Sequence, residues 1–322
     1  HDMEKKRISL IVPCYNEQEA LPLFYEAASR QMAALPGYDF ELLFVDDGSR
    51  DRTLSLLKAY AEKDARVRYL SFSRNFGKES AMYAGLVNAS GDYVAFMDAD
   101  LQDPPELLPQ MLDAVEKEGF DSAAARRVNR KGEGRVRSFF SRSFYGFMSR
   151  LTRMEMVEGA RDFRLMTREF VDALLALSER CRFTKGLFSW VGFKTKWIGY
   201  ENVERAAGET KWSMSQLFKY AFEGIIAFSV APLTWASVFG IAFCGIALLA
   251  FLFVFIRALV CGDPVAGWPS LVCIILFLSG VQLFCLGMVG QYLSRVYTET
   301  KRRPLYICRE SNVEKEKFVK IG

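Results

Sequence analysis

Residues 93–103 read YVAFMDADLQD. The apolar run at 93–97, which holds a valine and two aromatic residues, is typical of a short buried strand. Three aspartates and a glutamine follow it within six residues. Ligands of parallel α/β sheets lie beyond the carboxyl ends of the strands. The change from apolar to acidic therefore predicts a strand that carries polar groups into a binding site.

Strand-like and helix-like segments alternate on both sides of this stretch. The predicted strands are Ile8–Cys14, Leu42–Asp46, Val67–Phe72 and Tyr93–Asp98. The predicted helices are Glu19–Met32, Thr53–Glu62, Glu79–Asn88 and Glu106–Glu116. This β-α repetition predicts an α/β domain built on a doubly wound, mostly parallel sheet.

The composition excludes several kinds of catalysis. The 322 residues include one histidine, His1, within residues 1–3, which resemble the remnant of an expression tag and are set aside. A Ser-His-Asp triad, zinc held by histidine and acid–base catalysis by imidazole are therefore excluded. The seven cysteines are scattered and form no C-x-x-C pair, which argues against a disulfide framework or a zinc site.

Charge and hydrophobicity point to lipid rather than to nucleic acid. The net charge is only +4, from 42 basic and 38 acidic residues, so no nucleic-acid partner is expected and an anionic ligand must meet a local cluster. The hydrophobic content of 51% exceeds the ~45–50% that is usual for soluble chains.

Two long charge-free runs, Gly224–Ile256 and Pro264–Ser294, predict a transmembrane hairpin at residues 234–294. Its spans are expected at about Thr234–Ile256 and Pro269–Leu293, just after Pro232 and Pro264. A soluble protein would need two unusually long buried helices instead. The loop at 258–268 has no lysine or arginine, whereas residues 295–322 are basic near the second span. Both termini and the 295–322 tail are therefore expected in the cytoplasm.

Two amphipathic segments are expected at the membrane surface. Residues 123–153 hold nine basic residues and one acidic residue, and Phe140, Phe144, Phe147 and Leu151 recur at helical spacing. A second candidate helix at 214–225 lies within residues 206–233, which are expected to form a loop and a juxtamembrane helix. The alternatives are a solvated basic face for the first segment and ordinary core for the second.

Two acidic pairs follow predicted strands. Asp98 and Asp100, with Gln102, offer the oxygen ligands that Mg²⁺ or Mn²⁺ prefers, although aspartates at such a turn can also cap the next helix. Asp46 and Asp47 could accept the imide N–H of a base or a ribose hydroxyl, or form a simple turn. The sequence has neither a G-x-G-x-x-G motif after the first strand nor a Walker A lysine loop, so a nucleotide diphosphate would be held through the metal.

Four motifs in this order resemble those of the family 2 inverting glycosyltransferases. They are VPCYNE at 12–17, VDDGS at 45–49, SRNFGK at 73–78 and DADLQD at 98–103. The chain is most similar to the polyprenyl-phosphate hexosyltransferases, which include dolichyl-phosphate mannose synthase and the bacterial bactoprenol glucosyltransferases. The resemblance covers nearly the whole chain and implies a cytoplasmic GT-A-like catalytic domain at residues 4–205, followed by interfacial helices and the two-helix anchor.

The resemblance also implies roles for individual residues. Residues that match nucleotide-sugar contacts are Pro13, Tyr15, Glu17, Val45, Asp47, Lys78, Asp98, Ala99, Asp100, Arg205 and Lys211. Those that match metal ligands are Asp98, Asp100 and Gln102. Those that match contacts to the acceptor phosphate are Arg126, Arg137 and Ser141. Asp100, Arg126 and Asp162 are the residues expected to act in catalysis.

The expected reaction is transfer of a hexose, preferably glucose from UDP-glucose, to undecaprenyl phosphate with inversion, for modification of a cell-surface glycan. Such a phosphate is mostly dianionic at neutral pH, so it needs little help from a base such as Asp162. The enzyme is expected in the bacterial plasma membrane. Small residues in the spans, such as Gly240, Gly280 and Gly287, also allow a homo-oligomer.

Alternatives to this reaction are other sugar donors, a processive polysaccharide synthase and a membrane scaffold without activity. The other donors are GDP-mannose, UDP-GlcNAc, UDP-GalNAc and a UDP-amino-pentose. A processive synthase would usually carry a Q-x-x-R-W motif and more spans, and this sequence lacks that motif. A scaffold would have no need for acidic clusters at two strand ends.

Overall fold

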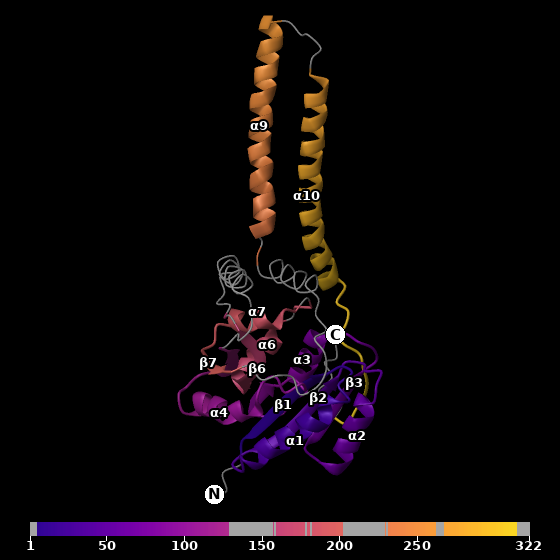
Figure 1. Ribbon diagram of the computed structural model, residues 1–322, viewed down its shortest axis with the longest axis vertical. Coiled ribbons are helices and arrows are strands. Elements are labelled where there is room, and N and C mark those ends of the chain that lie inside the picture. The colour runs from indigo at the N-terminus through magenta and orange to yellow at the C-terminus, as the bar shows by residue number, and fades with distance from the viewer. Residues whose placement is uncertain are drawn as a thin grey trace. The chain divides into compact units, whose positions relative to one another are not determined.

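The computed structural model describes residues 5–128, 157, 159–177, 179–180, 182–201, 229, 231–261 and 267–313. The two predicted interfacial helices lie outside these residues. The chain divides into two compact units, residues 1–216 with 303–322, and residues 217–302. Figure 1 labels the elements of each unit.

The first unit is built on a mixed sheet, which in the described part of the chain has eight strands. They are β1 (Arg7–Cys14), β2 (Asp39–Asp46), β3 (Val67–Phe72), β4 (Tyr93–Phe96), β5 (Ser122–Arg127), β6 (Ala160–Thr167), β7 (Thr195–Tyr200) and β8 (Cys308–Ser311). Their spatial order is β7-β5-β6-β4-β1-β2-β3-β8. β6 is antiparallel to both of its neighbours and β8 is antiparallel to β3, while the other pairs are parallel. The predicted α/β, mostly parallel sheet is confirmed.

The helices of the first unit follow the predicted pattern closely. They are α1 (Ala20–Ala33), α2 (Thr53–Lys63), α3 (Lys78–Asn88), η1 (Pro105–Leu107), α4 (Leu108–Glu116), α6 (Arg168–Ala176) and α7 (Thr184–Trp190). The first four predicted helices are each found to within three residues. β4 ends at Phe96 rather than at Asp98, which leaves residues 98–103 in a loop.

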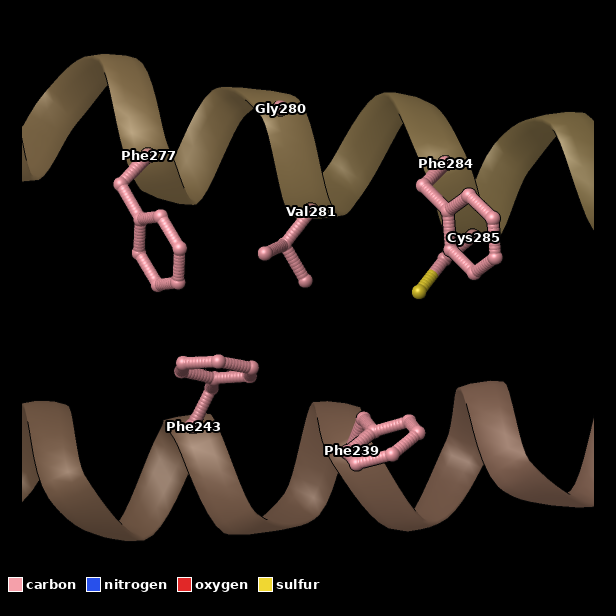
Figure 2. A pocket seen from close by; sticks show the side chains of 7 residues that line it. All are labelled: Phe239, Phe243, Phe277, Gly280, Val281, Phe284 and Cys285. Carbon is pink, nitrogen blue, oxygen red and sulfur yellow. The ribbon is translucent and has the colours of Figure 1, made fainter.

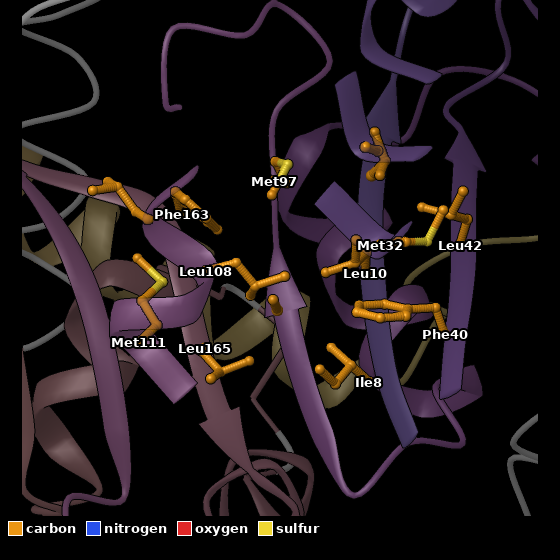
Figure 3. Packing of buried hydrophobic residues seen from close by; sticks show 14 of the residues in the cluster. Ile8, Leu10, Met32, Phe40, Leu42, Met97, Leu108, Met111, Phe163 and Leu165 are labelled. Carbon is orange, nitrogen blue, oxygen red and sulfur yellow. The ribbon is translucent and has the colours of Figure 1, made fainter. Parts of the chain in front are cut away.

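The core forms around the central strands. Ile8, Leu10 and Val12 of β1 are fully buried, as β1 has a parallel neighbour on each side. Figure 3 shows Ile8 and Leu10 beside Phe40 and Leu42. α3 packs closely on the same strand, because a Cβ placed on Gly85 would lie 2.2 Å from a side-chain carbon of Ile11. A rigid central sheet of this kind fixes the positions of the loops at the strand ends.

In the described part of the second unit, two long helices lie side by side, α9 (Ala231–Cys261) and α10 (Trp268–Thr300) (Figure 1). At 1.5 Å per residue, 31 and 33 residues each exceed a ~30 Å hydrocarbon core. Within the described residues, one helical segment, Phe277–Thr300, is long and apolar enough to cross a membrane, and Ala231–Phe243 is a shorter apolar segment. The predicted hairpin is therefore supported in part.

An apolar pocket of about 530 Å³ lies between these two helices (Figure 2). Its lining residues are Phe239, Phe243, Phe277, Gly280, Val281, Phe284 and Cys285. The rings of Phe243 and Phe277 meet edge to face, with centroids 5.5 Å apart. Near the start of α9, the Tyr292 hydroxyl donates a hydrogen bond to the carbonyl of Ser229 at 2.6 Å.

Candidate active site

The carboxyl ends of the parallel strands β1, β2 and β4 lie together at one end of the sheet, which is called the sheet edge below. β1 and β2 are parallel with Cys14 opposite Asp46, and β1 and β4 are parallel with Ile11 opposite Phe96. The polar residues that follow these strands are therefore brought to the same edge, as expected for a sheet of this topology.

The antiparallel strand β6 brings Asp162 to this edge as well. Arg164 of β6 lies opposite Phe96 of β4. Because the two strands run in opposite directions, Asp162 lies toward the end of β4 where the chain continues into Asp98. Two acidic residues that are 64 positions apart in the sequence thus flank one point of the sheet edge.

At the end of β2, the two aspartates are buried and are held mainly by backbone N–H groups. The Asp47 carboxylate accepts hydrogen bonds from the N–H groups of Phe76, at 2.6 Å, and Gly77, at 2.9 Å. Asp46 accepts from the N–H of Ser49, at 3.0 Å, and from the Ser71 hydroxyl, at 2.7 Å. Burial raises the pKa of Asp47, and the two N–H groups that bind it oppose that rise.

The loops after β1 and β2 are tied to each other. The N–H of Asn16 donates to the Ser49 hydroxyl and the Asn16 side chain accepts from the N–H of Arg50, both at 2.9 Å. Asn16 has φ 55°, in the left-handed region that asparagine tolerates. The N–H of Glu17 donates to the hydroxyl of Thr53, the first residue of α2. The predicted nucleotide-binding segments therefore form one connected surface.

Beyond β4, a lysine joins two carboxylates. The ammonium group of Lys78, the first residue of α3, lies 2.8 Å from Asp98 and 2.6 Å from Asp162. Lys185 of α7 lies 3.5 Å from the other carboxylate oxygen of Asp162. Burial alone would raise the pKa of Asp162, but Lys185 and Lys78 hold it below its usual range. For Lys78, the effect of Asp98 and Asp162 outweighs that of burial and raises the pKa of the ammonium group.

A buried ion pair supports the loop at residues 98–103. Asp103, with 1% of its surface exposed, accepts a hydrogen bond from Arg161 at 2.8 Å and one from the Tyr200 hydroxyl. Arg161 also donates to the side-chain oxygen of Gln102 at 3.1 Å. Leu101 has φ 54°, a strained value for a leucine, and its side chain packs on the core. The loop is thus fixed at its base, next to Asp98 and Asp100.

The side chains proposed to hold a metal offer only oxygen atoms. Asp98, Asp100 and Gln102 supply two carboxylates and an amide, a set that suits a hard divalent cation when phosphate oxygens complete its coordination. The described residues contain no cluster of three or more histidine, cysteine or acidic residues that could hold a metal alone. Asp98 contacts Lys78 and Gln102 contacts Arg161. The set therefore has suitable donor atoms for a divalent cation, and two of its three side chains contact cations of the protein itself.

Comparison with known proteins now assigns the family. The family model described as glycosyl transferase family 2 matches residues 9–175.

The chain belongs to glycosyl transferase family 2.

Relatives match this glycosyltransferase over nearly its whole length. It is 43% identical to the putative glycosyltransferase CsbB of Bacillus subtilis, over 97% of this chain and 94% of the relative. It is 42% identical to the bactoprenol glucosyl transferase of Shigella phage SfV, over 97% of this chain and the full length of the relative. The predicted family membership and enzyme class are confirmed.

A solved structure is also similar. Glucosyl-3-phosphoglycerate synthase from Mycobacterium tuberculosis, in complex with Mn²⁺ and UDP-glucose, matches with a TM-score of 0.47 and 20% identity. The match covers 69% of this chain and 77% of that one.

Most predicted site residues of the glycosyltransferase lie at the described sheet edge. Asp47, Lys78, Asp98, Asp100, Gln102 and Asp162 surround it, as set out above. Pro13, Tyr15 and Glu17 are partly buried at the end of β1, and Val45 and Ala99 are buried. Arg126 is exposed on β5, opposite Ala160 of β6. Arg137, Ser141, Arg205 and Lys211 lie outside the described residues.

The structure adds four residues that the sequence analysis did not select. They are Asp103, Arg161, Lys185 and Tyr200. Asp103 is the last residue of the DADLQD motif and Arg161 directly precedes Asp162, so their positions in the sequence were an available signal. Lys185 and Tyr200 reach the site because Phe188 of α7 packs on Phe96 of β4 and Phe170 of α6, and because β7 pairs with β5. No local pattern in the sequence indicates these contacts.

Proposed function

We propose that this glycosyltransferase transfers glucose from UDP-glucose to a polyprenyl phosphate, undecaprenyl phosphate in bacteria, with inversion at the anomeric carbon. The observation that carries the proposal is the meeting of Asp47, Asp98, Asp100 and Asp162 at one sheet edge, beside the cations Lys78 and Lys185. The proposed substrates follow the names of the relatives, several of which are bactoprenol glucosyl transferases.

The nucleoside of the sugar donor is assigned to the surface around β1 and β2. Pro13, Tyr15, Glu17 and Asp47 are the residues assigned to contact it. The Asp47 carboxylate is already oriented by the N–H groups of Phe76 and Gly77. A carboxylate held in this way can accept a hydrogen bond from an imide N–H or a ribose hydroxyl without further reorganisation.

The diphosphate of the sugar donor is assigned to the loop after β4. Asp98, Asp100 and Gln102 would hold Mg²⁺ or Mn²⁺, which supplies positive charge for the departing diphosphate when it is bound. Lys78 lies beside Asp98 and carries a positive charge at neutral pH. A second charge next to the leaving group would add to its stabilisation.

Asp162 is assigned the task of holding cations rather than of removing a proton. Its lowered pKa makes it a weak base, and a useful general base has a pKa near the working pH. The polyprenyl phosphate is already ionised and attacks through its own oxygen. Asp162 therefore fixes the positions of Lys78 and Lys185. The exposed Arg126 is assigned to contact the phosphate of the acceptor lipid.

The membrane topology proposed is a two-span hairpin with the catalytic domain and both termini in the cytoplasm. Support comes from β8, which follows α10 in the chain and yet pairs with β3 of the catalytic sheet. Chain segments that share one sheet lie on one side of a membrane, so the number of crossings between β7 and β8 is even. Reporter fusions should place Gly267 outside the plasma membrane and Asn312 in the cytoplasm. Reporters at both positions that are found on the same side of the membrane would overturn the hairpin.

The reaction is tested with the full chain in lipid vesicles that contain undecaprenyl phosphate. With Mg²⁺ or Mn²⁺, radiolabelled UDP-glucose should give label in an organic-extractable lipid, and a chelator should stop the transfer. GDP-mannose, UDP-GlcNAc, UDP-GalNAc and a UDP-amino-pentose form the comparison panel. If another donor of the panel is used and UDP-glucose is not, the sugar of that donor takes the place of glucose in the proposed reaction. A long polymer as product would favour a processive synthase, and no transfer from any donor would overturn the proposal.

A further inference from the structure

The segment after α10 adds an outermost strand, β8, to the side of the catalytic sheet that β3 would otherwise end. β8 pairs with β3 in antiparallel register, with Ser311 opposite Leu70 and Cys308 opposite Phe72. Ahead of β8, the N–H of Ser73 donates to the carbonyl of Ile307 at 3.0 Å. The segment therefore follows β3 to its last residue and one residue beyond.

Asn312 fixes the other end of this pairing. Its side-chain oxygen accepts from the N–H of Tyr69 at 2.7 Å, and its side-chain nitrogen donates to the carbonyl of Val67 at 3.1 Å. Its own N–H donates to the carbonyl of Tyr69 at 3.3 Å. These bonds satisfy backbone groups of β3 that an edge strand would otherwise expose, and they set the register of the segment.

A series of three aromatic rings in contact connects this segment with the proposed sugar-donor site. The ring of Tyr306 stacks on Phe72, with centroids 4.9 Å apart and planes 17° apart. Phe72 in turn meets Phe76 edge to face, with centroids 5.8 Å apart. Burial raises the pKa of Tyr306 to about 12, so its hydroxyl stays protonated at neutral pH. Both ring arrangements are favourable geometries for aromatic pairs.

The residues that receive this support hold the proposed active site. The loop at 73–77 donates the N–H groups of Phe76 and Gly77 to the Asp47 carboxylate, and Lys78 follows at once. The loop also touches the turn that carries Asp47, since a Cβ on Gly48 would lie 2.4 Å from the backbone of Arg74. A displacement of this loop would therefore move Asp47 and Lys78 together.

We propose that residues 306–312 are a positioning element of the sugar-donor site, and that Tyr306 is a positioning residue acting through Phe72 and Phe76 on Asp47. The assignment of Asp47 to the donor rests on the proposed function. The segment thereby makes the affinity for the nucleotide depend on chain that lies beyond the second long helix.

The test compares Tyr306→Ala, Tyr306→Phe and Ile307→Ala in the full-length protein in lipid vesicles. Ile307 is the matched control for the ring of Tyr306: it adjoins Tyr306, it is 54% exposed, and its contribution to the segment is a backbone carbonyl that alanine keeps. The measurements are the dissociation constant for UDP, KM and kcat for the sugar donor, and the melting temperature. Tyr306→Ala should weaken UDP binding and raise KM roughly threefold to tenfold, with a smaller change in kcat. Tyr306→Phe should restore both.

Equal UDP affinity and KM for Tyr306→Ala and Ile307→Ala would overturn the inference. If Tyr306→Ala fails to fold, Tyr306→Leu keeps an apolar side chain without the stacked ring, and the same comparison applies. A fall in kcat alone, or no recovery in Tyr306→Phe, would also overturn it. Wild-type protein that binds UDP but glucosylates no polyprenyl phosphate would overturn the proposed function and leave this test intact. Wild-type protein that binds no nucleotide would overturn both.

Discussion

The two acidic pairs at the sheet edge are held in different ways. Asp46 and Asp47, after β2, are buried and bind mainly backbone N–H groups. Asp98, after β4, is 26% exposed and binds the side chain of Lys78, while its neighbour Asp100 accepts from the N–H of Gln102 at 3.2 Å. Backbone groups cannot leave without refolding a loop, whereas a lysine side chain can rotate away. On the proposed function, the first pair would recognise a constant group of the sugar donor, and Asp98 would lie where cations and phosphates exchange during the reaction.

The largest expected effect comes from breaking the support under the second pair. Arg161→Leu removes the cation next to Asp103, which is 1% exposed. An unpaired buried carboxylate should lower the free energy of unfolding by about 3–5 kcal/mol at pH 7. The folded-state pKa of Asp103, which burial already raises, would rise further, so the deficit should shrink as the pH falls toward 4 and Asp103 takes up a proton.

Urea denaturation at pH 7 and pH 4 measures this prediction. The double variant Arg161→Leu with Asp103→Asn should recover stability at pH 7, since it has no buried charge. A deficit that stays constant with pH would show that Arg161 stabilises the loop by packing rather than by charge.

Loss of a proposed metal ligand should have the next largest effect. Asp100→Ala should lower kcat about 10²-fold to 10³-fold, because the leaving diphosphate loses much of its electrostatic stabilisation. The melting temperature should change little, as Asp100 is only partly buried. Asp113→Ala is the control, since that carboxylate is 58% exposed on α4. Turnover close to wild type that a chelator still abolishes would remove Asp100 from the metal site.

The first pair should respond in binding rather than in turnover. Asp47→Ala should raise KM for the sugar donor roughly 10-fold to 100-fold, since the carboxylate and the loop it orders are both lost. kcat should fall less. Asp39→Ala, at the opposite end of β2 and exposed, serves as the matched control in the same steady-state assay. If kcat falls by the larger factor, the contrast between recognition and chemistry at the two strand ends is wrong.

The smallest effect is expected at Asp64, which lies away from both pairs. Hydrogen bonds from Arg66 lower the pKa of Asp64 to about 2. The folded-state pKa is thus below the unfolded value of ~3.9, so this pair stabilises the fold above about pH 4 and loses that effect as the pH falls toward 2. Asp64→Ala should cost about 1–2 kcal/mol at pH 7 and less near pH 2, where the charge is lost and the bond from the Tyr25 hydroxyl remains, as measured by denaturation. An equal cost at both pH values would contradict this prediction.

The sequence indicated the local elements well and the distant pairings poorly. The first four strands and helices follow from short apolar runs and helical spacing, so they are found within a few residues of the predicted positions. β6 was not predicted, and it is the antiparallel strand that brings Asp162 beside Asp98. β8 is only four residues long and has a polar sequence, so no periodicity marks it as a strand. Its partner lies far away in the sequence.

The candidate site shows the same division. Asp47, Asp98 and Asp100 were predicted because they lie at the ends of predicted strands, whereas Asp162, which lies within β6, was selected through the family resemblance. Their cationic partners, Lys185 of α7 and Arg161 of β6, were not selected, because their contacts depend on how separate elements pack. Lys78 was selected through the family resemblance, and the structure adds that it joins Asp98 to Asp162.

The place of β8 in the chain has a consequence for biosynthesis. Tyr69 and Asn312, which are hydrogen-bonded, lie 243 positions apart, so the ribosome makes the whole second unit between them. Until β8 has been made, β3 is an edge strand without a partner on one side, and such strands pair readily with other chains. A nascent or truncated chain that lacks residues 308–312 keeps this edge exposed. The catalytic sheet is therefore completed only after the second unit has been synthesised, which makes β8 a structural checkpoint for that synthesis.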